Sequence, residues 1–208
     1  MNRQLCISRR MFPILALVML LAGCTGLPAP QSENLHLYVL DARPTFKAVT
    51  AKRDLVLAVS MPRTWPGFDT PQMAYVRQPH TLDYFAANRW ADTPPHMLEP
   101  LLAHALEQTG GFRAIVRAPG PVPADVRLET ELVRLQQNFQ TQPSQVQFTL
   151  RAQLVNVVSK QIIAVKQFDE AEIAPSDDAY GGVIAANQLL QRMLAELADF
   201  CVNASVSQ

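Results

Sequence analysis

The sequence predicts a single α+β domain in which two main helices pack on one face of a mainly antiparallel sheet. Three observations predict this class. Several segments alternate apolar and polar residues, two longer segments repeat apolar residues at spacings of three and four, and the last three alternating segments follow one another with short breaks. Successive strands with short connections favour a meander with one wet face, whose apolar face the helices can cover.

The first strands are predicted at residues 35–41, which alternate, and at 55–61, which are denser in apolar residues and read as more buried. Residues 62–72 contain three prolines and a glycine, which exclude a regular helix or a central strand. Residues 73–77 and 81–86 are predicted to pair as a short hairpin at an edge of the sheet.

The later strands are predicted at 112–118, 125–139, 144–158 and 161–173. In the second of these, the alternation breaks between Leu132 and Val133, which indicates a bulge. The segment 144–158 has the clearest alternation and gives one apolar and one polar face. In the last, the pattern does not decide whether Ile162 or Ile163 faces the core.

The first helix is predicted to follow Thr93, which suits an N-cap, with Pro94 at the first helical position and Gly110 as a left-handed stop. Pro100 conflicts with this helix because an internal proline removes a backbone hydrogen bond at a cost of about 3 kcal/mol. Two alternatives therefore remain open, a kink or a later start near Glu99.

The second helix is predicted from about Asp178 to Cys201, with Ser176 or Asp177 as its cap. Gly181 and Gly182 stand near its start and read as helix punctuation. One apolar stripe follows the helical period, and it comprises Val183, Ala186, Leu190, Met193 and Leu197, flanked by Ile184, Leu194 and Cys201.

The N-terminus carries a signal for export and acylation. Three Arg precede an apolar run of twelve residues, 11–22, which is too short to span a bilayer because a spanning helix needs about 20. The run ends in Leu-Ala-Gly-Cys, and this order resembles the lipobox of bacterial lipoproteins. The resemblance implies that residues 1–23 are a signal peptide and that Cys24 receives acyl chains after cleavage. Two or three chains would hold the protein on a membrane stably.

The mature chain then divides into three parts. Residues 24–34 contain prolines and small polar residues and read as a flexible tether that leaves the orientation of the domain free. Residues 35–202 are predicted to be the folded domain, and 203–208 a C-terminal tail. Thr25 follows the acylated position, where the lipoprotein resemblance associates Asp with inner-membrane retention. The presence of Thr25 in place of Asp therefore favours the periplasmic face of the outer membrane.

Composition excludes several other classes. Without residues 1–23, which hold three Arg and no acidic residue, the 18 basic residues become 15 against 18 acidic, a net charge near −3. A surface of this sign, with no basic cluster, argues against nucleic-acid binding. Cys201 is then the one cysteine left besides Cys24, so an internal disulfide is not expected, and Cys201 reads as a small buried hydrophobe.

Catalytic and cofactor motifs are absent from the sequence. The four histidines are scattered, no zinc-protease, Cys-His or Gly-x-Ser-x-Gly pattern occurs, and neither glycine pair precedes a Lys-Ser or Lys-Thr. The carboxylate pairs Asp169–Glu170 and Asp177–Asp178 are sequence neighbours, which point apart on a strand and favour the dipole at a helix start. We therefore expect no enzyme activity, no cofactor and no metal.

The chain from Leu57 to Phe112 resembles the ABC-type transport auxiliary lipoprotein family, which includes paraquat-inducible protein C. The features that carry the likeness are Tyr38-Val39-Leu40, the Val59 strand with Pro62, DTPQMAYVR, the Tyr84 region, Arg89-Trp90-Ala91, Pro94-Pro95, and Leu106 with Gly110-Gly111-Phe112. With the lipobox and the C-terminal helix, the likeness covers nearly the whole mature chain. The loop at 64–68 and Pro100 depart from the family pattern.

The resemblance implies a non-enzymatic role beside ABC transporters whose partner carries mammalian-cell-entry domains and which move lipids or other hydrophobic molecules across the envelope. The anchored domain would grip a periplasmic tunnel, and a ring of copies is compatible with this. Tyr75, Arg77, Tyr84 and Trp90 are candidate contact residues, because aromatic and Arg side chains dominate interface energy; Tyr75 and Trp90 could equally fill the core. The alternative function is a lipoprotein that binds or activates a cell-wall synthase or a secretion channel.

Overall fold

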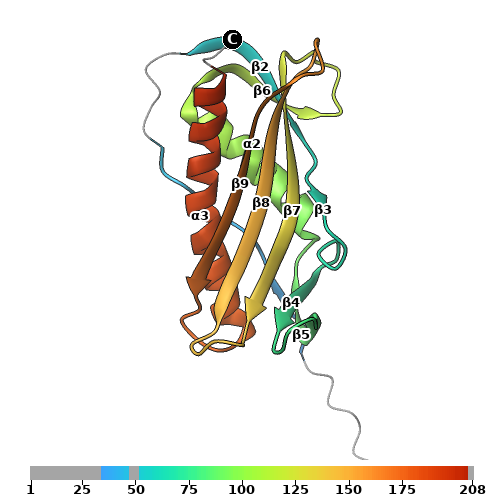
Figure 1. Ribbon diagram of the computed structural model, residues 1–208, viewed down its shortest axis with the longest axis vertical. Helices are drawn as coiled ribbons and strands as arrows, with labels where there is room; N and C mark the ends of the chain where they lie inside the picture. The colour runs from blue at the N-terminus through green and yellow to red at the C-terminus, as the bar shows by residue number, and fades with distance from the viewer. Residues whose placement is uncertain (1–33, 47–51, 206–208) are drawn as a thin grey trace, which may run out of the picture. The chain divides into compact units, whose positions relative to one another are not determined.

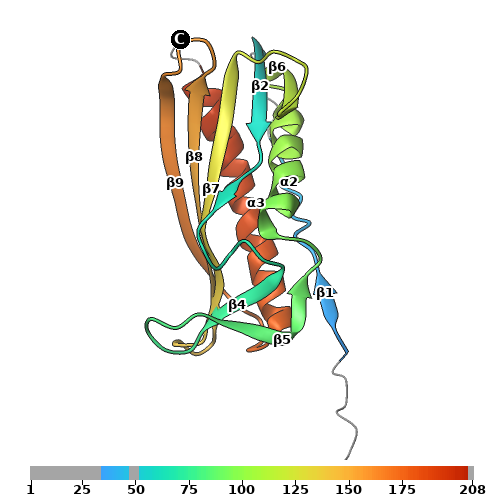
Figure 2. The ribbon, with the colours of Figure 1, turned by 90° about the vertical axis from the view of Figure 1, so that its right-hand side faces the viewer.

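A long central strand, β7 (Val126–Asn138), organises the sheet of the computed structural model, which describes residues 34–46 and 52–205. One edge of β7 pairs along its whole length with β8 (Gln145–Asn156), and β8 pairs with β9 (Ile162–Ile173). The other edge of β7 is shared by three shorter strands, with β2 beside its start, β3 beside its middle and β4 beside its end. Figures 1 and 2 show this arrangement.

The remaining elements complete one nine-stranded sheet and two helices within the described residues. Their bounds are β1 His36–Tyr38, β2 Arg53–Ser60, β3 Arg63–Thr64, β4 Gln72–Val76, β5 Asp83–Trp90, α2 Pro94–Thr109, β6 Phe112–Ala118 and α3 Ala179–Ala204. Outside the described residues lie the predicted signal peptide, Cys24, the tether up to residue 33 and the tail from 206. None of the described helices is both long and apolar enough to cross a membrane.

The predicted fold class, α+β with two helices on one face of the sheet, is confirmed. The two longest ladders, β7 with β8 and β8 with β9, are antiparallel, as the meander requires. The sheet is nevertheless mixed, because β2, β3 and β4 run parallel to β7, and β6 runs parallel to β2. Parallel pairing needs long crossover connections, and the period of a sequence does not reveal it.

The predicted hairpin is confirmed as the antiparallel pair of β4 and β5, and within the described pairings the first half of β5 has no strand on its side away from β4, so the predicted segment 81–86 lies at an edge of the sheet. β1 pairs in parallel with the second half of β5, from Asn88 to Trp90, and forms the edge there. β5 is accordingly longer than the alternation at 81–86 predicts. Within the pairings described, the outer edge of β1 has no neighbouring strand.

Both helices lie on the same side of the sheet (Figure 2). α3 packs on β7, β8 and β9, while α2 packs on β2 and β6 and touches α3. The strand faces beneath them supply the core, whose largest fully buried members include Phe148, Leu150 and Leu154 of β8 and Leu189, Leu190 and Met193 of α3. Burial of such side chains stabilises a fold by about 1.5–3 kcal/mol each.

The helix ends differ in part from the predictions. α2 begins at Pro94 and contains Pro100, so a start near Glu99 is wrong. Gly110 ends α2 in the left-handed conformation, with φ of 64°, as predicted. The cap of α3 is Asp178, whose carboxylate accepts a hydrogen bond from the Gly181 N–H at 2.7 Å. Neither of the predicted caps, Ser176 or Asp177, takes that position.

The structure decides two points that the sequence raised about the long strands, the bulge in β7 and the inward face of β9. The break predicted between Leu132 and Val133 is confirmed, because the register of β7 against β8 shifts between Leu132 and Arg134. In β9 the structure decides for Ile163, which packs against the core, whereas Ile162 is 57% exposed. A second irregularity near this point, where Leu154 pairs with Ala164, explains why the sequence pattern did not decide between them.

Candidate functional site

The end of the sheet at which α3 begins gathers aromatic side chains that are only half-buried. Tyr75 of β4, Phe85 of β5 and Phe139, which follows β7, meet there with ring centroids 4.7, 5.9 and 6.3 Å apart. Tyr75 lies opposite Gln137 and Asp83 in the registers of its two neighbouring strands. The three rings therefore project from the helix-bearing side of the sheet, since residues two apart in a strand share a face.

Arg77 completes this group, which we name the aromatic–arginine cluster: Tyr75, Arg77, Phe85 and Phe139. The guanidinium carbon of Arg77 lies 5.0 Å from the centroid of the Tyr75 ring and 5.8 Å from that of Phe139. These distances are typical of a cation–π interaction. Among the described residues Arg77 forms no ion pair, and its side chain is exposed while the rings are half-buried. The cluster thus offers both apolar area and an uncompensated positive charge.

Local backbone pairing explains how the cluster is positioned. The N–H of Phe139 donates to the carbonyl of Val76 at 2.8 Å, which extends the β4–β7 ladder to the residue beside Arg77. The β4–β5 turn at 77–82 brings Phe85 back alongside β4, and the hydroxyl and N–H of Thr81 both donate to the carbonyl of Gln78. Each ring is therefore positioned by a backbone segment that is paired with its neighbour, namely β4, β5 or the end of β7.

Tyr84 takes a different role from the one predicted by its residue type. It points to the other side of β5 from Phe85, and its hydroxyl donates to the carbonyl of Gly67 at 3.0 Å. Gly67 has φ of +94°, and a Cβ there would approach Leu82 to 2.8 Å, so the turn requires glycine. Tyr84 therefore positions the loop between β3 and β4 and does not join the cluster.

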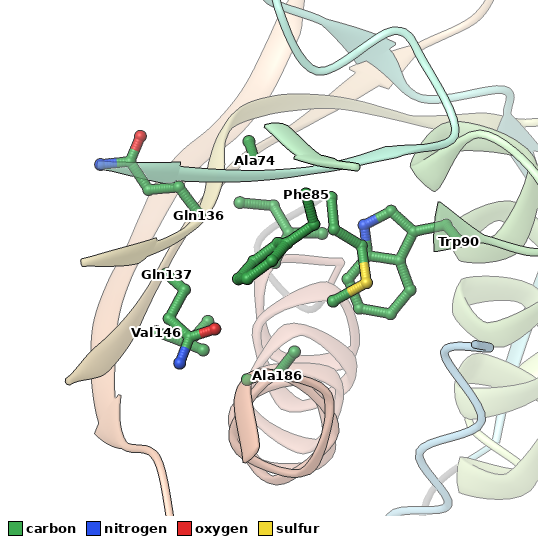
Figure 3. A pocket seen from close by; sticks show the side chains of 10 residues that line it. Ala74, Phe85, Trp90, Gln136, Gln137, Val146 and Ala186 are labelled. Atoms are coloured by element: carbon green, nitrogen blue, oxygen red, sulfur yellow. The ribbon is translucent and has the colours of Figure 1, made fainter. Parts of the chain in front are cut away.

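Trp90 lies in the core, with 4% of its surface exposed. Its burial removes it from any partner surface, and of the two alternatives stated for this residue the structure supports core filling. Figure 3 shows Trp90 and Phe85 on one side of a small cavity that also faces Ala186 of α3. The cavity holds about 10 Å³ of solvent space, which is room for about one water molecule and none for a lipid.

Gln137 forms the polar side of this cavity (Figure 3). The residue is 3% exposed; its amide nitrogen donates to the Ser144 hydroxyl at 2.9 Å, while its amide oxygen has no hydrogen-bond partner. That oxygen lies against the backbone of Gly182, and a Cβ at this position would clash with it. A Cβ at Gly181 would likewise clash with the carbonyl of Ser176. Both glycines thus lie inside α3 and allow close packing, so the interpretation as helix punctuation is wrong.

The carboxylates of the two pairs noted in the sequence each have a partner. Asp169 accepts hydrogen bonds from the Thr149 hydroxyl at 2.7 Å and from Arg134 at 2.9 Å, and these hold the pKa of Asp169 below its ordinary value. The N–H of Ser144 donates to Asp177 at 2.7 Å and lowers its pKa in the same way. A general acid needs a raised pKa, so neither group has the property that such chemistry requires.

The other groups with reactive potential are dispersed. His96 contacts Asp92 at 3.1 Å and His104 lies 3.9 Å from Glu107, both on the surface of α2. Over residues 34–46 and 52–205, no group of three or more His, Cys, Asp or Glu side chains could hold a metal ion. Cys201 is fully buried, which raises the pKa of its thiol and confirms its interpretation as a core residue.

The comparisons with known proteins agree with this fold. The family model of the ABC-type transport auxiliary lipoprotein component matches residues 38–198. The chain belongs to this family, and the resemblance found in the sequence is confirmed. No curated protein matches the chain.

Solved structures share the fold. A Xanthomonas campestris protein of the DUF330 family is 22% identical, with a TM-score of 0.76 over 82% of this chain and 97% of that one. The hypothetical protein CT253 of Chlamydia trachomatis is 8% identical, with a TM-score of 0.56 over 75% of this chain and 100% of that one. At these identities the similarity concerns the fold alone.

Two of the four predicted contact residues, Tyr75 and Arg77, thus lie together, and sequence reasoning missed Phe85 and Phe139. Phe139 could have been noticed as the one aromatic residue within the glutamine-rich segment 136–147. Phe85 had no such signal, since its segment contains several apolar residues. Their meeting depends on the order of β5, β4 and β7, which sequence pattern did not give.

Proposed function

We propose that the protein is a non-enzymatic, membrane-anchored docking component of an ABC-type transport system whose partner carries mammalian-cell-entry domains. The system would move lipids or other hydrophobic molecules across the Gram-negative envelope. Acyl chains on Cys24 would hold the protein at the periplasmic face of the outer membrane. Membership of the transport auxiliary family carries this proposal. The lipobox supports its anchor, and the absence of a metal-binding cluster from the described residues is compatible with a role without catalysis.

The aromatic–arginine cluster is the surface that we assign to the partner. Aromatic and Arg side chains contribute most of the energy of typical interfaces, chiefly where the centre becomes fully desolvated. The rings of Tyr75 and Phe139 are held in place before binding, so little side-chain freedom remains to be lost. Arg77 forms no ion pair within the described structure, so a carboxylate of the partner could pair with it in two parallel hydrogen bonds.

Recovery of partners from crosslinked envelopes tests this function. The wild-type lipoprotein should bring down a mammalian-cell-entry protein, identified by mass spectrometry. A variant with Tyr75→Ala and Phe139→Ala should recover at least about tenfold less of that protein. Loss of a hot-spot residue costs about 2 kcal/mol, and about 1.4 kcal/mol corresponds to a tenfold change in affinity. Recovery of a cell-wall synthase or a secretion channel instead would contradict transport and support the alternative function.

Matched variants separate the cluster from exposed aromatic residues in general. Trp65 is 53% exposed in the loop between β3 and β4, and Trp65→Ala should leave recovery unchanged. Arg77→Glu should reduce recovery strongly, because it replaces the free cation with a charge that repels a carboxylate. Arg63→Glu makes the same change at an exposed site outside the cluster and should have little effect. Equal losses from both members of a pair would show that the cluster is not the contact.

A further inference from the structure

A second apolar surface lies at β1, the edge strand that pairs with the second half of β5. Leu35, Leu37 and Val39 occupy alternate positions in and beside β1, and they are 52%, 61% and 49% exposed. Because alternate residues of a strand share one face, these three form a continuous row, which we name the β1 apolar row. Scattered exposed apolar residues are ordinary, but three in register on one edge strand are not.

The first turn of α3 extends this surface. Tyr180 is 58% exposed, and its ring centroid lies 6.1 Å from that of Tyr38. Leu37 and Val39 on one side, and Tyr180 and Ile184 of α3 on the other, line a shallow groove between β1 and α3. The charged residues that line the same groove are Asp41 and Arg43, whose charges cancel. The groove is therefore apolar beside β1 and the first turn of α3, becomes polar further along α3 at Asn187, Gln188 and Gln191, and has no net charge.

Chain length places this row near the membrane if Cys24 is acylated. Ten residues lie between Cys24 and Leu35, which makes eleven Cα–Cα steps along the chain. A flexible chain of that length has a root-mean-square span of about 20 Å, and it reaches about 40 Å when fully extended. The row is thus the first part of the folded domain after the anchor, and it stays within one short tether of the headgroups. A membrane is the one macromolecular surface that this chemistry keeps permanently beside the row.

Tethering changes what a small apolar contact can achieve. Three exposed aliphatic side chains and one tyrosine would not hold a soluble protein on a bilayer. Once the acyl chains have inserted, however, the second contact becomes intramolecular and is favoured by a high effective concentration. Leu and Val side chains suit the boundary between headgroups and acyl chains, and Tyr is enriched at that depth.

We propose that the β1 apolar row and Tyr180 form a second membrane contact, which seats in the interface of the bilayer that carries the acylated Cys24. This inference rests on the proposed acylation. The contact fixes the orientation of the domain relative to the membrane, in place of the free orientation expected from the tether alone. The bilayer it requires is uncharged or weakly anionic, and the contact is insensitive to salt because the groove has no net charge.

A fluorescent label tests the contact on the full lipoprotein. With Cys24 acylated and Cys201 fully buried, an introduced cysteine is the reactive thiol available to a dye. The variant Leu37→Cys carries an environment-sensitive dye, and Val158→Cys carries the same dye as a control. Val158 is 86% exposed in the turn between β8 and β9. That turn lies at the other end of the sheet from β1 (Figure 2). The proteins are reconstituted into phosphatidylethanolamine and phosphatidylglycerol vesicles with or without brominated acyl chains.

We expect bromine to reduce the emission of the dye at position 37 by about twofold or more, because a residue at the headgroup–acyl boundary meets the bromines directly. The dye at position 158 should be unaffected. Leu35→Glu with Val39→Glu should abolish the quenching at position 37 while the protein still floats with the vesicles. Quenching that survives these charges reports only closeness through the tether and overturns the contact.

The remaining outcomes separate the contact from the anchor. If the protein floats but the dye at position 37 is not quenched, the contact is wrong and the anchor stands. If the protein does not float, Cys24 carries no acyl chains and both the anchor and the contact fall. The emission of the dye at position 37 is also measured without vesicles. If it reports an apolar environment there, and more strongly at higher protein concentration, a second copy of the chain covers the row and the membrane contact is overturned.

Discussion

Two cations lie over aromatic rings in the part of the chain that the structure describes, and they differ in what surrounds them. Lys166 of β9 lies 4.7 Å from the centroid of Phe168, and its ammonium also pairs with Glu196 of α3 at 3.2 Å. Phe168 is buried and meets Phe200 of α3 edge-on. Arg77 lies over Tyr75 in a similar way, but the rings of that cluster are only half-buried, and among the described residues no carboxylate pairs with its cation.

The difference shows that the position of a cation–aromatic group relative to α3 decides whether the group stabilises the fold or stays available to a partner. Under the helix, the aromatic ring is desolvated and the cation is neutralised, so the group contributes to stability. Beyond the start of the helix, the rings stay half-buried and the cation stays free. That arrangement costs stability unless something else covers it, which is why we assign it to a partner. Four predictions follow this contrast, in order of expected size.

The largest effect is expected from Phe168→Ala under α3. Removal of a fully packed phenylalanine costs about 3–5 kcal/mol in free energy of unfolding, because it loses burial and leaves a cavity. Phe139→Ala in the aromatic–arginine cluster should cost about 1 kcal/mol or less, because the ring is half-exposed. Urea unfolding of the two variants measures both values. Equal losses would mean that the cluster belongs to the core.

A smaller effect is expected where α3 begins. Gly182→Ala places a methyl group against the amide oxygen of Gln137, so the helix must move or Gln137 must shift. Overpacking of this kind costs about 1–3 kcal/mol. Thermal unfolding measures the loss, and Gln137→Ala in the same chain should restore part of it because the obstructing oxygen is gone. A neutral Gly182→Ala would show that α3 does not need this close approach.

The cap of α3 should contribute less again. Asp178→Ala removes the acceptor of the Gly181 N–H and should cost about 1 kcal/mol in free energy of unfolding. Asp178→Asn keeps an acceptor and should cost less. Ser176→Ala is the matched control, since Ser176 was a predicted cap but its hydroxyl instead donates to Asp178. A loss from Ser176→Ala as large as that from Asp178→Ala would contradict the assignment.

The smallest effect concerns pH. The pKa of Asp169 is lowered in the folded protein, so its hydrogen bonds add stability above the unfolded pKa, near 3.9, and that stability disappears as the pH falls through the folded pKa. The difference in free energy of unfolding between wild type and Asp169→Asn should therefore be constant from pH 7 to about 5 and shrink below about pH 4. A difference independent of pH would mean that Asp169 has no lowered pKa.

The sequence predicted well those elements whose signal is local. The alternation from Val146 to Leu154 became β8, the spacing of Val183, Ala186 and Leu190 became α3, and the bulge after Leu132 appeared as predicted. The cap of α3 was misplaced by one or two residues, because three consecutive residues at 176–178 can all accept a hydrogen bond from a helix N-terminus. Such neighbours are distinguished by tertiary contacts, here by the Ser144 N–H that occupies Asp177.

The candidate site was predicted only in part because it depends on long-range pairing. Tyr75 and Arg77 were identified by residue type, and they lie together because Arg77 directly follows the end of β4, two residues after Tyr75. Phe139 is more than sixty residues away and reaches them only through the parallel pairing of β4 with β7. Trp90 was chosen by the same reasoning and lies in the core, since residue type alone does not separate a buried aromatic side chain from an exposed one.

Photo-crosslinking in living cells tests the central claim most directly. A photoreactive amino acid at position 139, in the open cluster, should form a covalent adduct with a mammalian-cell-entry protein when the envelope is irradiated. The same amino acid at position 200, a half-buried residue of α3 beside Phe168, should form no such adduct. Adducts from both positions, an adduct from 139 with a cell-wall synthase or a secretion channel, or none from 139 would contradict the account.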